Sequence, residues 1–173
     1  EELGYPFNQL PEETFSSFRG GVEGWGSMCG ALVPAIAAIG MVAQGPDRAE
    51  MVNELMGWYR EFPFPEYQEK GFDLPGVAVN SSLCHVSVSV WMNETGYGPR
   101  STPERGERCA GLTADVCRKT AQMLNQWAEE QSFVKVYHPA GNVSYCMSCH
   151  SEAMPPYAHG KESCVDCHGD HTN

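Results

Sequence analysis

The sequence predicts a mainly α-helical protein in which a small helical scaffold domain is followed by a short, loop-rich C-terminal segment. Apolar residues recur at helical spacing through long stretches of the first 135 residues, only one short stretch alternates as a strand does, and proline and glycine accumulate after residue 139. The 173 residues suffice for one domain with a real core. We therefore divide the chain into a scaffold, residues 1–135, and a C-terminal segment, residues 136–173.

Five stretches organise the scaffold. Residues 16–43 have helical spacing, although the glycines of their first half favour a loop or close packing there. Residues 47–61 are predicted as a second helix, and the prolines of residues 62–76 make that stretch a connector. In residues 77–91 valine alternates with serine, which favours a strand, with a helix as the alternative. The clearest helix covers residues 101–130 and begins with Ser-Thr-Pro-Glu, which resembles a capping box.

Charge and hydropathy exclude two classes of partner. The formal net charge is -11, and nowhere do five or more basic residues run together, so we expect no nucleic-acid partner. The longest apolar stretch, residues 29–43, is shorter than the roughly 20 residues of a membrane-spanning helix and contains Pro34. We therefore expect no membrane span. Because the sequence begins at Glu1 and shows no signal segment, we expect an exported protein whose signal has been removed.

Two pentapeptides of the C-terminal segment carry the clearest chemistry: Cys146-Met147-Ser148-Cys149-His150 and Cys164-Val165-Asp166-Cys167-His168. Both fit Cys-x-x-Cys-His, the attachment pattern of c-type haem. The two thiols bind the vinyl groups of one porphyrin, and the histidine that follows becomes the proximal iron ligand. A single copy would also suit a thioredoxin-like redox pair or half of a zinc site. Two complete copies in a loop-rich segment predict two covalently bound haems c per chain.

The remaining histidines offer a second axial ligand for each iron. His150 and His168 are the predicted proximal ligands. The candidate distal ligands are His138, His159 and His85. Methionine is the competing distal ligand, but Met154 lies on the same short loop as His150 and would struggle to reach the opposite haem face. Bis-histidine ligation lowers the potential relative to methionine ligation and leaves no position open for a substrate. We therefore expect electron transfer and no enzyme activity.

The spacing of the two motifs predicts neighbouring haems. Only 18 residues separate Cys146 from Cys164, and the stretch between them is rich in turn residues. Such a tether is far more compact than an extended chain. We expect the two haems to lie near contact and to exchange electrons rapidly.

Four further cysteines lie in the scaffold: Cys29, Cys84, Cys109 and Cys117. No two of them have Cys-x-x-Cys spacing. They are either buried thiols or disulfides, which an exported protein permits, or thiolate ligands of a metal or iron–sulfur site. The spacing alone favours the first alternative.

Three segments around these cysteines resemble a known family: Gly26-Ser27-Met28-Cys29-Gly30-Ala31, Cys84-His85-Val86-Ser87-Val88 and Glu107-Arg108-Cys109-Ala110-Gly111-Leu112-Thr113-Ala114-Asp115. They are similar to the scattered signature of the redox-active family named for its C-GCxxG-C-C pattern. With the two haem motifs added, the chain resembles the split-Soret cytochromes c over nearly its full length. This resemblance implies a periplasmic homodimer with two stacked haems per subunit, a haem ligand that crosses from the partner subunit, and a non-haem iron–sulfur centre.

Carried over residue by residue, the resemblance makes Cys29, Cys84 and Cys109 ligands of that centre, whether of the [2Fe-2S] type or another non-haem iron centre. Cys117 is a weaker candidate. No cysteine precedes Cys29, so the first cysteine of the family pattern has no match, and a three-cysteine or labile site is favoured over a complete four-thiolate cluster. Two other functions remain as alternatives, a small periplasmic haem or iron reductase and a thiol-based redox sensor. The redox partner proteins cannot be derived from the sequence.

Overall fold

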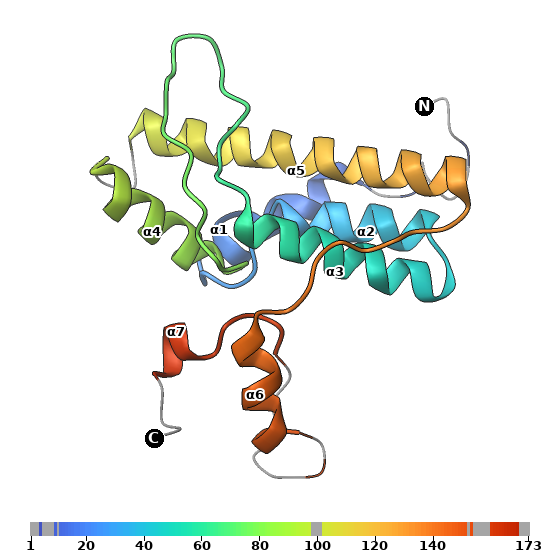
Figure 1. Cartoon of the computed structure of the whole chain (residues 1–173). Coiled ribbons are helices and arrows are strands. Elements are labelled where there is room, and N and C mark those ends of the chain that lie inside the picture. The colour runs from blue at the N-terminus through green and yellow to red at the C-terminus, as the bar shows by residue number, and fades with distance from the viewer. Residues whose placement is uncertain are drawn as a thin grey trace. The chain divides into compact units, whose positions relative to one another are not determined.

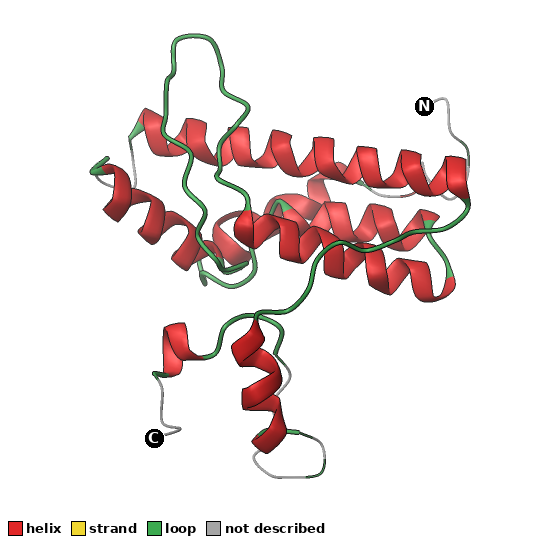
Figure 2. Ribbon diagram, viewed as in Figure 1, coloured by secondary structure: helices red, strands yellow, loops and turns green. Residues whose placement is uncertain are grey.

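The computed structural model describes residues 4, 9, 11–97, 102–151, 153 and 160–169. Within these residues the regular structure is helical throughout, and pairing between extended segments is confined to two isolated β-bridges (Figure 2). The elements in order are η2 (Glu12–Phe18), α1 (Arg19–Val22), α2 (Leu32–Val42), α3 (Gly45–Glu61), α4 (Cys84–Thr95), α5 (Pro103–Glu130), α6 (Gly141–Cys149) and α7 (Val165–His168). The prediction of a mainly α-helical protein is confirmed.

The chain divides into two compact units, Glu1–Val136 and Tyr137–Asn173. In the first unit, α2, α3 and α5 pack against one another, as their parallel course in Figure 1 shows. Their apolar faces form its core, in which each fully buried large side chain contributes roughly 1.5–3 kcal/mol. The core residues are Leu32, Ala35, Ile39, Ala43, Met51, Leu55, Tyr59, Phe64, Leu112, Val116 and Met123.

The two long helices begin and end where the sequence predicts. Both α3 and α5 have a proline in the first turn, where the missing N–H costs no helical hydrogen bond. Thr102 precedes α5 but makes no side-chain capping hydrogen bond, so the capping box does not form. The indole Nε1 of Trp127 donates to Asp47 Oδ2 at 3.0 Å, which joins the end of α5 to the start of α3.

One local prediction is confirmed in part and another differs from the structure. In residues 16–43 the second half forms α2, whereas Gly20 and Gly21 adopt φ of 64° and 69° in the first half, where the glycines predicted a loop or close packing. The strand favoured for residues 77–91 is wrong, since α4 covers most of that stretch. Ser87 and Trp91, four residues apart, form the buried face of α4, and the valines between them tolerate the helix.

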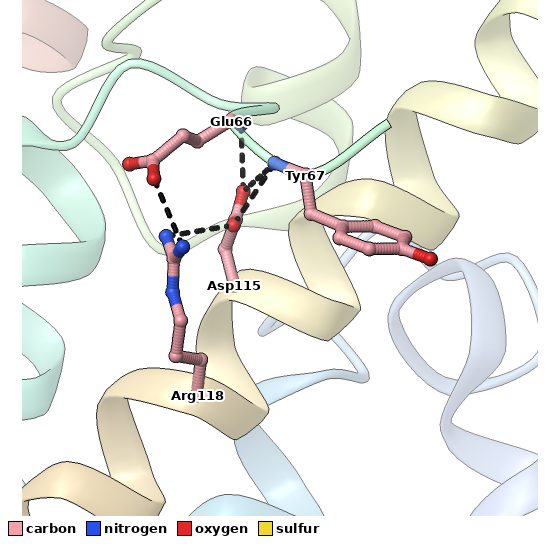
Figure 3. A network of polar contacts seen from close by, with 4 residues as sticks. All are labelled: Glu66, Tyr67, Asp115 and Arg118. Atoms are coloured by element: carbon pink, nitrogen blue, oxygen red, sulfur yellow. Dashed lines mark hydrogen bonds and ion pairs between the residues drawn. The ribbon is translucent and has the colours of Figure 1, made fainter. Parts of the chain in front are cut away.

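A buried carboxylate joins α5 to the connector between α3 and α4 (Figure 3). Asp115 is 0% exposed and accepts hydrogen bonds from the backbone N–H of Glu66 at 2.8 Å and of Tyr67 at 3.1 Å. Arg118 pairs with Asp115 at 3.1 Å and with Glu66 at 2.9 Å. Gly111 lets the connector approach, because a Cβ there would collide with the Tyr67 carbonyl. These contacts hold the helix that carries Cys109.

Candidate metal and haem sites

Backbone hydrogen bonds bring Cys29 and Cys84 together although 55 residues separate them in the sequence. Cys29 N donates to Ser82 O at 2.9 Å, and Cys84 N donates to Ser27 O at 2.7 Å. Cys29 lies in the loop before α2, and Cys84 is the first residue of α4. Both thiols therefore come from element ends that are held by main-chain contacts.

Cys109, on α5, completes a group of three cysteines that line one cavity of about 710 Å³. Burial is the main cause that raises the pKa of the Cys84 thiol, and the nearby Cys29 and Cys109 thiols raise it further. Cys117 does not line the cavity; it is exposed and lies eight residues later, about 12 Å along the helix axis. The structure thus brings together the three cysteines that the family resemblance selects and leaves Cys117 apart.

Polar residues from three helices surround the Cys29 sulfur. Burial raises the pKa of the Cys29 thiol, whereas hydrogen bonds from the Tyr59 hydroxyl and from the Ala31 backbone and the charge of Arg108 lower it. Tyr59 Oη lies 3.3 Å from Ser87 Oγ, and Arg108 Nη2 donates to Ser87 Oγ at 2.9 Å. Sequence reasoning missed Tyr59, Ser87 and Arg108 as parts of the site. The available signal was a polar residue at a buried position of each helix.

The donor set suits iron, because thiolates are the ligands of iron–sulfur centres. Among the described residues, no three cysteine, histidine or carboxylate side chains lie close enough to hold a single metal ion. The three thiols are instead spread around a cavity. A buried guanidinium beside them matches the negative charge that thiolate ligands bring.

Each Cys-x-x-Cys-His motif forms a short helix in the C-terminal unit. Cys146 and Cys149 lie on the last turn of α6, and His150 follows as its C-cap residue. Cys164 is the N-cap residue of α7, which includes Cys167 and His168. Residues three apart share one face of a helix, so each pair of thiols points to one side, as attachment to one porphyrin edge requires. The turn residues of this segment had predicted loop instead.

The two motifs lie against each other. The Cys164 thiol donates to Glu162 O at 3.8 Å, and burial together with the neighbouring Cys146 thiol raises the pKa of Cys164. Asn142 Nδ2 donates to Ser163 Oγ at 2.7 Å, and Tyr137 Oη donates to Lys161 O at 3.2 Å. The first cysteines of the two motifs are therefore neighbours.

The candidate distal histidines fall in different places. His138 is exposed in the C-terminal unit, and His159 lies outside the described residues. His85 is exposed at the start of α4, and its Nδ1 donates to Gly26 O at 2.7 Å. A backbone carbonyl on one ring nitrogen is the usual arrangement of a metal-binding histidine, because it leaves Nε2 free to bind the iron.

Comparison with known proteins identifies the family. The model of the C_GCAxxG_C_C family, described as putative redox-active proteins, matches residues 1–123 of this chain. The chain belongs to the C_GCAxxG_C_C family. The match includes Cys29, Cys84 and Cys109 and ends before the haem motifs, so the shared scaffold is the part that holds the cysteine-lined cavity.

The similarity to split-Soret cytochrome c extends beyond the family match. The split-Soret cytochrome c of Desulfovibrio desulfuricans (strain ATCC 27774 / DSM 6949 / MB) is 35% identical over 178 residues, which cover 97% of this chain and 63% of that protein. This chain therefore spans less than two thirds of that relative. A solved structure, described as a novel iron centre in the split-Soret cytochrome c from Desulfovibrio desulfuricans ATCC 27774, matches with a TM-score of 0.87 and 34% identity over 96% of this chain and 73% of that chain.

These matches confirm the resemblance stated from the sequence and support a redox role for this C_GCAxxG_C_C protein. No helix in the described part of the chain combines the length and apolar character that a bilayer span requires. The similarity covers both compact units, because the structural match extends over nearly the whole chain.

Proposed function

We propose that this chain is an electron-transfer cytochrome with two covalently bound haems c and a non-haem iron centre. The observation that carries the proposal is the pair of helical Cys-x-x-Cys-His motifs whose first cysteines are neighbours. When bound, the haems supply one-electron redox chemistry. The similarity to split-Soret cytochrome c supports the same role.

The residues of the two motifs hold the haems. Cys146 and Cys149 anchor one porphyrin, and His150 follows them as its axial ligand. Cys164, Cys167 and His168 do the same for the second. Because the Cys146 and Cys164 thiols are neighbours, the two haems would be attached through sulfur atoms that lie near each other. This contact supports a closely spaced pair that exchanges electrons rapidly.

We extend the proposal to bis-histidine ligation at both irons. His138 lies just before α6, and His85 offers Nε2 with Nδ1 already tied to a carbonyl. His159 stays a third candidate. Two imidazoles per iron leave no open position for a substrate, which supports a carrier and not a reductase. The resemblance further supports a periplasmic homodimer in which one distal ligand comes from the partner subunit.

The cysteine-lined cavity is the proposed iron centre. Cys29, Cys84 and Cys109 would be its protein ligands, and the spread of the three sulfurs around a cavity supports an iron–sulfur centre, such as a [2Fe-2S] type, over a lone iron. Two arginines, Arg105 and Arg108, line the same cavity. Their positive charge would stabilise an anionic centre.

Haem attachment is tested on the purified protein by extraction with acid and organic solvent. We expect two haems to stay with the polypeptide, and one to stay in a variant with Cys164→Ala and Cys167→Ala. We also expect a low-spin ferric spectrum and no carbon monoxide binding on reduction. Colour that leaves the wild-type polypeptide would refute covalent attachment, and a high-spin fraction that binds carbon monoxide would favour a reductase.

The iron centre is tested by iron and acid-labile sulfide analysis. We expect iron in excess of haem, and the loss of that excess in Cys29→Ser, Cys84→Ser and Cys109→Ser. Cys117→Ser is the matched control, because Cys117 lies on α5 but does not line the cavity. Equal iron and haem contents in the wild-type protein would contradict the centre.

A further inference from the structure

Arg108 is a buried cation, and the described residues offer it no anionic partner. It is 1% exposed and lines the cavity next to Cys109 on α5. Its Nη2 donates to Ser87 Oγ, its Nε has no hydrogen-bond partner, and the ion pairs of the described residues do not include it. An uncompensated charge in a protein interior is strongly unfavourable. An anion in the cavity would remove this cost.

A chain of polar groups leads from Arg108 to one of the three sulfurs. Ser87 on α4 lies between the Arg108 guanidinium, at 2.9 Å, and the Tyr59 hydroxyl, at 3.3 Å. The Tyr59 hydroxyl on α3 also neighbours the Cys29 thiol, and hydrogen bonding to it lowers the pKa of that thiol. Tyr59 and Ser87 are 0% and 1% exposed, so water does not compete for these bonds.

The number of hydrogens that each group can donate sets the direction of these hydrogen bonds. A guanidinium can only donate, so Ser87 accepts from Arg108 and its own hydroxyl hydrogen can go to Tyr59 Oη. Tyr59 has a single hydrogen, which is then left for the Cys29 sulfur. Hydroxyl hydrogens rotate freely enough to adopt this order once the sulfur carries negative charge. Three helices thus direct donors toward one sulfur.

We propose that Tyr59, Ser87 and Arg108 are positioning residues that raise the reduction potential of the iron centre by hydrogen-bonding the Cys29 sulfur and placing a buried positive charge beside it. The inference rests on the proposed iron centre. One-electron reduction adds one negative charge to such a centre and breaks no bond. A donor on a sulfur ligand and a nearby cation stabilise the more negative, reduced state, because the burial of Tyr59 and Arg108 weakens screening by solvent.

The test is a redox titration of the iron centre in the haem-loaded protein, with dithionite as reductant and the electron paramagnetic resonance signal as the readout. In Tyr59→Phe we expect the ratio of reduced to oxidised centre at a fixed potential to fall about tenfold, equal to ~59 mV for one electron. In Ser87→Ala and Arg108→Lys we expect smaller shifts in the same direction. Tyr67→Phe is the matched control, because the Tyr67 side chain is exposed and outside the cavity.

The outcomes separate this inference from the proposed function. A wild-type protein without iron beyond its haems refutes the iron centre itself. Wild-type iron and sulfide contents in Tyr59→Phe and Ser87→Ala, combined with unchanged potentials, overturn only the inference. If the Tyr59→Phe protein loses iron, the potential of the Ser87→Ala protein tests the inference instead, because that variant keeps both the Cys29 ligand and the Tyr59 hydroxyl. The haem potentials, read from the visible spectrum of the same samples, serve as the internal reference and should not move.

Discussion

The Asp115 network offers the sharpest test of how the scaffold holds the cysteine-bearing helix. We predict that Asp115→Asn destabilises the first unit by about 3–5 kcal/mol. The side chain is 0% exposed and accepts from two backbone N–H groups and from Arg118. Asparagine keeps one acceptor oxygen and turns an NH₂ group toward the remaining donors. At least one buried donor then loses its partner, at about 1–3 kcal/mol, and the other bonds lose their charge assistance.

The measurement is urea unfolding followed by circular dichroism, with a thermal scan beside it. For a domain of this size a loss of 3–5 kcal/mol corresponds to a fall in Tm of roughly 6–20 °C. Asp73→Asn makes the same change of charge at an exposed position of the same connector and should stay within about 0.5 kcal/mol of wild type. If the free energy of unfolding of Asp115→Asn lies within about 1 kcal/mol of that of Asp73→Asn, the network does not hold the connector as described.

Three further predictions concern single positions. Gly111→Ala should lower the free energy of unfolding, measured in urea, by about 1–3 kcal/mol, because the new Cβ meets the Tyr67 carbonyl. Gly106→Ala on the same helix is the control and should be neutral or stabilising, because its Cβ meets nothing within 4 Å. Equal effects of the two substitutions would contradict the close approach of the connector to Gly111. Gly96→Ala should cost about 1 kcal/mol by the same measurement, because Gly96 ends α4 at φ 72°; an unchanged unfolding midpoint would exclude strain there. In iron-depleted protein, iodoacetamide should modify the exposed Cys117 before the half-buried Cys29, as peptide mass spectrometry would show; the reverse order would contradict the assigned exposure.

Long, strongly periodic segments could be predicted from the sequence. The helices α3 and α5 follow from apolar residues at helical spacing and from a proline in each first turn. The prediction of a strand in residues 77–91 was wrong, because a stretch in which valine and serine alternate can also form a helix when Ser87 and Trp91 are its buried positions. The short helices α6 and α7 carry no periodic signal, since each is under three turns long and turn residues flank it.

The haem motifs are local in the sequence, whereas the cysteine-lined cavity is not. A pattern of five residues is sufficient to recognise each haem site. Cys29, Cys84 and Cys109 converge only after three elements pack, and their spacing alone favoured isolated thiols. The resemblance to a family selected them. Tyr59, Ser87 and Arg108 were missed because a polar residue on a buried face has no local partner in the sequence.

The hydrogen bonds between the Cys29 loop and the start of α4 determine which positions of this scaffold tolerate substitution. The hydrogen bonds that align Cys29 with Cys84 run between main-chain atoms, so most side chains in both segments can be exchanged without moving the sulfurs. Gly26 is a strict position, because it has φ 71° and a Cβ there would come within 3.0 Å of the His85 Cβ. Homologous scaffolds can therefore diverge widely and still present their thiols in one geometry, which suits a signature made of a few isolated cysteines and glycines.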